Sequence, residues 1–161
     1  MPLPKVWVYA EGEDGKATSA TLELLTKARE IGDTVEAVYS GADADAIAPQ
    51  LGEYGATKVH STDHGSSLSG VIGGALLAKI VADEQPDLIL FAQSYDGRDA
   101  MGRLSVKLDR PVLTNGTLTP FQRFAAMNTR QTMPMKTGTI TRCVSSKSRV
   151  VCLSILWTRY R

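Results

Sequence analysis

Residues 87–92 read Asp-Leu-Ile-Leu-Phe-Ala, and this nearly continuous apolar run decides the fold class. A half-exposed strand alternates apolar and polar residues, whereas a strand buried on both faces of its sheet does not. We therefore predict a strand here that is covered on both sides. Sheets of that kind are largely parallel, because the helices that connect parallel strands lie on both faces.

Strands and helices alternate on both sides of this run. The ranges that predict strands are 6–9, 35–39, 58–61 and 87–92, with a fifth strand opening at 111–113; those that predict helices are 19–31, 43–54, 68–80 and 101–108. This alternation implies right-handed crossovers between parallel strands. The predicted fold is α/β, a doubly wound and mainly parallel sheet with helices on both faces. Gly32 is expected to end the first helix as a left-handed cap.

The distribution of charge along the chain is uneven. The chain has 161 residues, which suits one domain with a sizeable core. Residues 1–109 hold 9 Lys and Arg against 17 Asp and Glu, a net charge of −8, whereas residues 110–161 hold 9 basic residues and no acid. We predict a domain over residues 1–116 and an atypical, poorly ordered basic tail over 117–161. Our hypothesis is that a frameshift or truncation follows Gly116. Within the tail, residues 150–157 have the composition of a strand, though an isolated one.

Targeting signals and metal motifs are not evident in the sequence. No apolar run reaches the roughly 20 residues that cross a membrane, and the first residues lack the layout of a signal or transit peptide. A cytoplasmic location is expected. Cys143 and Cys152 are eight residues apart, which is not zinc spacing, so reduced thiols are expected. A metal site at His60 and His64, with Asp63 between them, is conceivable. A surface loop after the third strand is favoured, and no metal site is predicted.

Two glycine-containing stretches allow a phosphate-binding interpretation. Residues 12–16, Gly-Glu-Asp-Gly-Lys, are too few for a P-loop, and their acids would repel a phosphate, so an acidic surface turn is predicted. Gly70, Gly73 and Gly74 lie early in a predicted helix, and helix N-termini attract anions. Close packing of this helix on the sheet is the favoured explanation of these glycines.

The segment after the 87–92 strand holds the candidate site, because ligands and partners of a doubly wound sheet bind at the carboxyl ends of its strands. Gly97 permits an unusual backbone angle, and Asp99 complements the dipole of the helix that begins here. Arg98, next to Asp96, could hold a nucleotide phosphate or an acidic partner. The alternative is an Asp-Gly turn followed by a solvated arginine. No catalytic constellation is found in the chain.

Four pieces of the sequence occur in an order that is typical of one family. In residues 92–108, Gly97-Arg98 is followed by a second arginine, Arg103, within an alternating helix; the other pieces are residues 21–28, 51–59 and 111–116. The second of these contains Tyr-Gly-Ala followed by Lys-Val. Together they resemble the electron transfer flavoprotein alpha subunit over about residues 5–116.

The resemblance implies a heterodimeric flavoprotein that carries electrons and is not an enzyme. In that family, the first domain of the alpha subunit packs with the beta subunit as a scaffold, and the second domain holds most of the FAD. Electrons pass from acyl-CoA or related dehydrogenases through the flavin to a membrane quinone reductase. The FAD-binding motifs of the second domain do not occur in this sequence, so the chain is expected to be truncated and unable to hold FAD alone.

Two other classes of protein share some of these features. An adenine-nucleotide-binding regulatory module of universal-stress-like type has the same kind of sheet, adenine-nucleotide alpha-hydrolase-like, but usually carries a glycine-rich ATP loop late in the chain. Nucleic-acid binding would use the basic tail, where Phe121, Phe124, Trp157 and Tyr160 lie among the charges. Nucleic acid is the less favoured partner. Tight ATP or AMP binding would support the first class, and steeply salt-dependent RNA or DNA binding the second.

Overall fold

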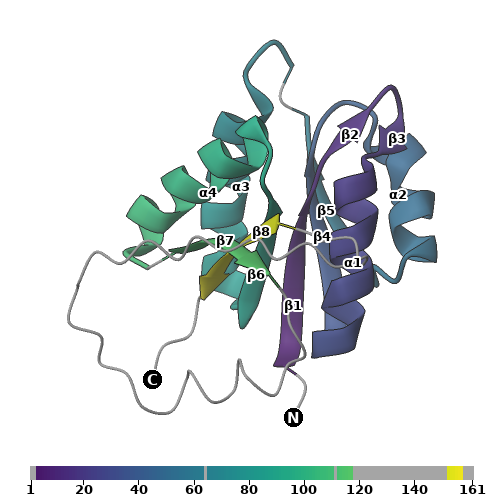
Figure 1. The fold of residues 1–161 in the computed structure, drawn as a ribbon. Coiled ribbons are helices and arrows are strands. Elements are labelled where there is room, and N and C mark those ends of the chain that lie inside the picture. The colour runs from purple at the N-terminus through teal and green to yellow at the C-terminus, as the bar shows by residue number, and fades with distance from the viewer. Residues whose placement is uncertain (1–2, 64, 111, 118–151, 158–161) are drawn as a thin grey trace.

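The computed structural model describes residues 3–63, 65–110, 112–117 and 152–157. Among these residues, six strands form one sheet in the order β5-β4-β1-β6-β8-β7 (Figure 1). The sheet strands are β1 (Leu3–Ala10), β4 (Gly32–Ser40), β5 (Lys58–Thr62), β6 (Leu88–Ala92), β7 (Val112–Thr117) and β8 (Cys152–Trp157). The helices are α1 (Ser19–Ile31), α2 (Ala44–Glu53), α3 (Ser69–Glu84) and α4 (Tyr95–Leu108).

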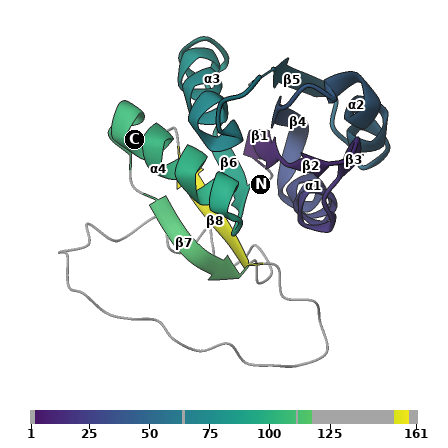
Figure 2. The same ribbon diagram turned by 90° about the horizontal axis from the view of Figure 1, so that it is seen from above.

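Helices cover both faces of the sheet, which confirms the doubly wound α/β fold (Figure 2). α1 and α2 pack on one face, where the side chains of Val6 and Val8 on β1 join the same cluster. α3 and α4 pack on the other face against Trp7 and Tyr9, the alternate residues of the same strand. Successive residues of a strand point to opposite faces, so the wholly apolar end of β1 supplies both cores. Within the described residues, no helix is both long and apolar enough to span a membrane.

Parallel pairing among β5, β4, β1 and β6 forms the larger part of the sheet. β6 lies beside β1, and all five of its residues are buried, as its unbroken apolar sequence predicts. Residues 12–16, predicted as an acidic turn, form the tip of a small antiparallel hairpin of β2 (Gly12–Glu13) and β3 (Lys16–Ala17). The hairpin projects beyond the carboxyl end of β1 (Figure 1).

The last strand, β8, lies between β6 and β7 and runs antiparallel to both. The strand expected within residues 150–157 is therefore confirmed, but the expectation that it would be isolated is wrong. Its backbone pairs with the most buried strand of the sheet, with Leu90 opposite Ile155. The division of the chain near residue 116 stays a prediction, although β7 runs through Thr117 and β8 completes the same sheet.

Gly32 does not act as the left-handed cap that the sequence suggested. Its backbone is extended, with φ −124° and ψ 145°, and α1 passes directly into β4 at this residue. A Cβ atom on Gly32 would lie 3.3 Å from the carbonyl oxygen of Ala28 and would collide with the side chain of Val6. Glycine is needed here because the end of α1 approaches β1 closely, not because of its backbone angle.

The three glycines early in α3 are packing residues, as predicted, but their neighbours differ from those expected. Only Gly73 faces the sheet, where a Cβ atom would meet the phenol ring of Tyr9. Gly70 and Gly74 lie against the backbone of α4, at Asp96 and Ala100. The small residues thus bring α3 close to α4 as well as to the sheet.

We predict that Gly73→Ala destabilises the protein by about 1–3 kcal/mol, because the added methyl group overpacks a buried contact with Tyr9. Gly102→Ala is the matched control: Gly102 is exposed in α4, and a Cβ there meets nothing within 4 Å. That change should stabilise the helix by up to about 1 kcal/mol. Urea unfolding measures both, and equal effects of the two substitutions would contradict the packing role of Gly73.

Candidate functional site

The strand order of the sheet reverses between β1 and β6. From β1 the chain proceeds outward through β4 to β5 and then returns across α3 to β6 on the other side of β1. In open α/β sheets, ligands bind in the crevice outside the carboxyl ends of the strands at such a reversal. In this protein the crevice lies beyond Ala10 of β1 and Ala92 of β6.

A hydrogen bond between side chains spans this crevice. The hydroxyl of Ser94, which follows β6, donates to the Oε1 atom of Glu11, which follows β1. Ser94 is also the N-cap of α4, and its Oγ atom accepts a hydrogen bond from the Gly97 amide at 2.8 Å. On the other side, the backbone N–H of Glu11 donates to Thr21 Oγ1 at 2.8 Å, which fixes Glu11 to the start of α1. The two strand-end loops are therefore joined across the switch point.

Gly97 lies directly below this bond. It is a buried helical residue of α4 and is not among the glycines with positive φ, so the unusual backbone angle that glycine permits is not used here. A Cβ atom there would lie 2.9 Å from Glu11 Oε1 and would collide with the carbonyl oxygen of Ala92. Glycine is required because α4 begins in close contact with the end of β6 and with the Glu11 carboxyl.

The electrostatics of the crevice are unfavourable to anions. Burial raises the pKa of the Glu11 carboxyl, and the charge of Asp96 raises it further, against the lowering effect of hydrogen bonds from Ser94 and Gly97. Burial, with the nearby carboxylates of Glu11 and Asp96, also raises the pKa of Tyr9. The N-terminus of α4 would attract a phosphate by its dipole, but the chain's own carboxyl group lies there.

The four residues predicted from the sequence do not converge on one point. Asp96 accepts a hydrogen bond from the hydroxyl of Ser69 on α3. Arg98 extends over the ring of Tyr95 at 5.7 Å and donates to the Gln93 carbonyl oxygen at 3.1 Å. Asp99 accepts from Nε of Arg103 one helical turn later, at 3.0 Å. They stand along the start of α4, with the side chains of Asp96 and Arg98 exposed.

Sequence reasoning did not predict the contact between Glu11 and Ser94, the two residues that close the crevice. A signal existed for Ser94, because serine three residues before Gly97 at the start of a helical pattern is typical of an N-cap. No local signal existed for Glu11, since its partner lies 83 residues away in the chain.

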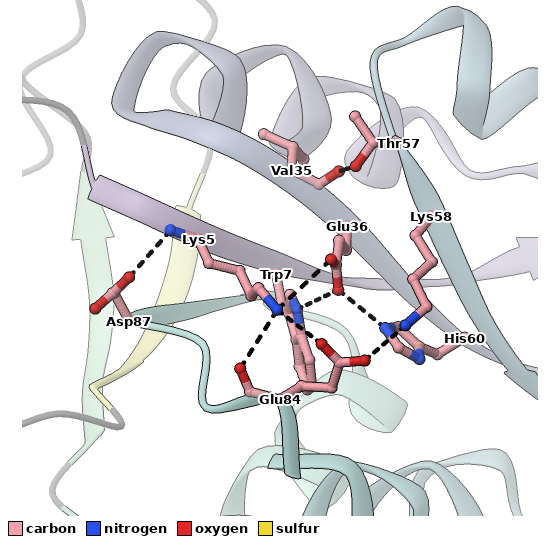
Figure 3. A network of polar contacts seen from close by, with 9 residues as sticks. All are labelled: Lys5, Trp7, Val35, Glu36, Thr57, Lys58, His60, Glu84 and Asp87. Atoms are coloured by element: carbon pink, nitrogen blue, oxygen red, sulfur yellow. Dashed lines mark hydrogen bonds and ion pairs between the residues drawn. The ribbon is translucent and has the colours of Figure 1, made fainter.

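A second polar cluster lies near the opposite, amino-terminal ends of the strands (Figure 3). Its centre is Glu36 on β4, which is buried. Glu36 Oε2 accepts a hydrogen bond from Trp7 Nε1 at 2.8 Å and lies 2.9 Å from His60 Nε2. Lys5 Nζ is 3.8 Å from the other oxygen of the same carboxylate. The carboxylate therefore connects β1, β4 and β5 on the face that α3 covers.

Glu84 extends this cluster to the last residue of α3. Its carboxylate is 2.7 Å from Lys5 Nζ and 2.6 Å from Lys58 Nζ. Hydrogen bonds from Lys5 and then Lys58 lower the pKa of Glu84 to about 2. Asp87, just before β6, accepts from the Lys5 backbone N–H at 3.0 Å. Because its groups are paired with one another, the cluster fixes the end of α3 to three strands.

The structure places His60 within β5, in agreement with the strand predicted over residues 58–61, and not in the loop that follows this strand. His60 contacts Glu36 and packs its ring 5.2 Å from that of Trp7, which shows a structural role. His64 and Cys143 lie outside the described residues. Within the part of the chain that the structure describes, no group of three or more His, Cys, Asp or Glu residues is arranged to hold a metal ion.

Comparison with known proteins matches most of the chain to one family. A family model described as the electron transfer flavoprotein domain matches residues 6–158. The electron transfer flavoprotein subunit alpha of Syntrophomonas wolfei subsp. wolfei is 35% identical over 112 residues, which are 68% of this chain and 35% of that protein.

Two further relatives carry similar names. The acryloyl-CoA reductase electron transfer subunit beta of Anaerotignum propionicum is 31% identical over 64% of this chain and 30% of its own length. The electron transfer flavoprotein subunit alpha of Clostridium acetobutylicum is 28% identical over 64% of this chain and 32% of its own. The chain thus spans about a third of the length of these curated relatives.

Replacement of Glu11 by glutamine should change the pH dependence of stability. Because folding raises the pKa of Glu11 above 4.5, the native state binds this proton more tightly than the unfolded state. The contribution of Glu11 to the free energy of unfolding is fully present at pH values below its unfolded-state pKa. It is lost as pH rises through its higher folded-state pKa. Relative to Glu11→Gln, the wild type should therefore lose unfolding free energy as pH rises above about 4.5.

Urea unfolding of both proteins at a series of pH values from about 4.5 upward measures the difference. In Ser94→Ala, which lacks the hydrogen bond that lowers the pKa of Glu11, the loss should extend to higher pH. A wild-type advantage over Glu11→Gln that stays constant or grows with pH would contradict a buried Glu11.

Glu84→Gln should show the opposite pH dependence. Its folded pKa of about 2 lies below the ordinary 4.5, so the stability it contributes is present above pH 4.5 and is lost as pH falls towards 2. The thermal midpoint of Glu84→Gln should be below that of the wild type at pH 6, and the gap should close as pH falls. A gap that is the same at both ends of a series of melting curves would argue against the pairing with Lys5 and Lys58.

Proposed function

Because the chain belongs to the electron transfer flavoprotein domain family, we propose that it serves as an alpha-type scaffold domain of a flavin-dependent electron carrier. Its relatives are named as electron transfer subunits, and the family transfers electrons instead of catalysing a reaction of its own. The observation that carries the proposal is the bond between Ser94 and Glu11, which occupies the crevice where this fold would otherwise bind a ligand.

The described residues do not fit FAD at the switch point. A pyrophosphate bound there would need the free N-terminus of α4 and a neutral or basic surrounding. Instead, the carboxyl of Glu11 faces the Gly97 amide, and the charge of Asp96 lies close to it. The space beside the Cα atom of Gly97, where a phosphate could approach the backbone, is already occupied by the Glu11 carboxyl and the Ala92 carbonyl oxygen. In our proposal, the flavin of the complete carrier is FAD and is bound outside this crevice, so that this chain does not hold FAD alone.

The proposed partner is a beta subunit, with which the chain forms a heterodimer. The word "subunit" in the names of the relatives supports an assembly of this kind. The electron donors of the complete carrier would be acyl-CoA or related dehydrogenases, and the compartment would be the cytoplasm. Arg98 and its neighbours Asp96 and Asp99 are exposed or partly exposed at the start of α4, where they suit contact with a protein.

The alternative of an adenine-nucleotide-binding module is disfavoured by the same geometry. The triphosphate of ATP is strongly negative. The crevice cannot neutralise it, because Glu11 and Asp96, which lie there, are both acidic. Within the described residues around the crevice, Arg98 is the nearby base on α4, and its guanidinium is placed over Tyr95. The proposed role is therefore a scaffold, not a nucleotide sensor.

The reading-frame hypothesis for residues 117–161 remains a hypothesis. The match of the family model through residue 158 and the pairing of β8 with β6 favour a genuine C-terminal part. Sequencing the coding DNA through and beyond codon 116, with translation of every frame, tests it directly. A second frame that encodes a better match to the family would support the frameshift.

We expect the full chain to form a stable complex with a beta subunit from the same organism and to retain no flavin by itself. Co-expression followed by size-exclusion chromatography measures the first point, and the visible absorbance of bound flavin measures the second. The chain expressed alone and reconstituted with excess FAD is the control. Separate elution of the two subunits, or flavin retained by the chain alone after the column, would contradict the proposal.

A further inference from the structure

The two central strands stop pairing before they reach the crevice. Parallel pairing of β1 with β6 ends at Val8 and Leu90, whereas pairing of β1 with β4 continues to Ala10. The hydrogen bond between Ser94 and Glu11 lies beyond the last β1–β6 pair, where it joins the loops that follow the two strands. The start of α4 is therefore held to β1 at this point by a side-chain contact, and one of its two partners is ionisable.

The first turn of α4 buries little apolar surface. Tyr95 is 89% exposed, and Asp96 is exposed as well. The buried residue of this turn is Gly97, which has no side chain. The later turns are held in the core by three buried side chains, those of Ala100, Met101 and Leu104. Detaching the first turn alone therefore exposes little apolar surface, and segments of this kind open locally while the rest of a domain stays folded.

One hydroxyl group connects this turn to β1. Ser94 Oγ accepts a hydrogen bond from the Gly97 amide at 2.8 Å and donates its own hydrogen to Glu11 Oε1. Glu11 is fixed from the other side, because its backbone N–H donates to Thr21 Oγ1 at 2.8 Å and its carbonyl oxygen accepts from the same hydroxyl at 3.1 Å. When the contact breaks, Ser94 and the turn that it caps are the part that moves.

The charges near Glu11 oppose its ionisation while the contact is closed. Burial raises the pKa of the Glu11 carboxyl, and the charge of Asp96 on α4 adds to this effect. Hydrogen bonds from Ser94 and Gly97 act in the opposite direction without reversing the rise. Below it on β1, the phenol of Tyr9 stays neutral, because burial and nearby carboxylates raise its pKa too. The closed arrangement therefore binds the Glu11 proton more tightly than an open one, in which the carboxyl meets water.

The other groups at this point supply no positive charge that would offset this effect. Asp99 on α4 is one more acid at the same end of the sheet. α1 presents the hydroxyl of Thr21, and α3 presents that of Ser69. Arg98, the base of this turn, donates to a backbone carbonyl oxygen at 3.1 Å. Among the residues that the structure describes, no base forms an ion pair with Glu11.

We propose that the Ser94–Glu11 contact is a proton-operated latch, which holds the first turn of α4 on β1 while Glu11 is protonated and releases that turn more often once Glu11 is ionised, with the sheet still folded. The released turn carries Tyr95 and Arg98, so pH sets how firmly these exposed side chains are positioned. The inference does not rest on the proposed heterodimer. It also differs from an effect on overall stability, because it assigns the opening to one helical turn.

Hydrogen exchange of single amides in the full-length chain, followed by NMR, measures this opening. The Gly97 amide reports on the latch, and the Leu90 amide in the buried strand β6 reports on global unfolding. Protection factors, which are corrected for intrinsic exchange, are compared from about pH 4.5 upward and at low urea concentrations. That of Gly97 should fall with pH, by at most about tenfold per pH unit for one proton. Low urea should lower that of Leu90 and leave that of Gly97 unchanged, because a local opening exposes little surface.

Three variants separate the latch from other causes. Glu11→Gln keeps an oxygen that can accept from Ser94 but cannot ionise, so its Gly97 protection factor should not depend on pH. Ser94→Ala removes the contact and the cap together, and its Gly97 protection factor at the lowest pH should be about fivefold below that of the wild type. Glu84→Gln is the matched control: its carboxyl lies at the opposite end of the sheet, and with a pKa of about 2 it is ionised throughout this range. This variant should keep the wild-type pH dependence at Gly97.

Three results would overturn the latch. The first is a wild-type protection factor of Gly97 that does not change with pH. The second is a pH dependence that survives in Glu11→Gln, because another group would then be responsible. The third is equal protection and equal urea dependence for Gly97 and Leu90, which would show that the turn opens only when the whole domain unfolds.

Discussion

Ser94 donates its hydroxyl hydrogen to the carboxyl of Glu11 beyond the carboxyl ends of β1 and β6, where the strand order reverses. Because Ser94 also caps α4, this contact fixes the first turn of that helix relative to both central strands. Gly97 must be glycine to fit beneath this bond, and the charge of Glu11 adds to the effect of burial in raising the pKa of Tyr9. The place where a doubly wound sheet commonly binds an anion is thereby filled from within the chain.

The two ends of the sheet differ in whether their acidic side chains are paired with basic ones. At the amino-terminal ends, Glu36 and Glu84 face Lys5, Lys58 and His60, so acids and bases are paired and join α3 to three strands. At the carboxyl ends, acids are in excess and partly exposed. The paired end accounts for stability, since an unpaired buried carboxylate would be costly.

The sequence predicts the parts of this fold that depend on local pattern. The apolar run of β6, the buried stripe of α1 and the strand–helix alternation follow from periods that are read along a few residues. Gly32 and Gly97 show the limit of prediction from local pattern. From the sequence, both glycines were explained by the backbone angles that glycine allows. In the structure, each must be glycine because another segment of the chain approaches it closely. The strand that contains His60 was predicted, but nothing local shows that Glu36 lies across from this residue. Likewise, the pairing of β8 with β6 depends on a contact between residues more than sixty positions apart.

The central claim is that the chain's own carboxyl closes the switch point, so that the domain acts by docking instead of by binding a nucleotide. Isothermal titration of the folded full-length chain with ATP tests it most directly. The account predicts no saturable heat up to about 1 mM ATP, since Glu11 and Asp96 oppose the phosphates where the helix dipole would attract them. A saturable isotherm with a dissociation constant in the micromolar range would contradict it and would return the protein to the nucleotide-binding class.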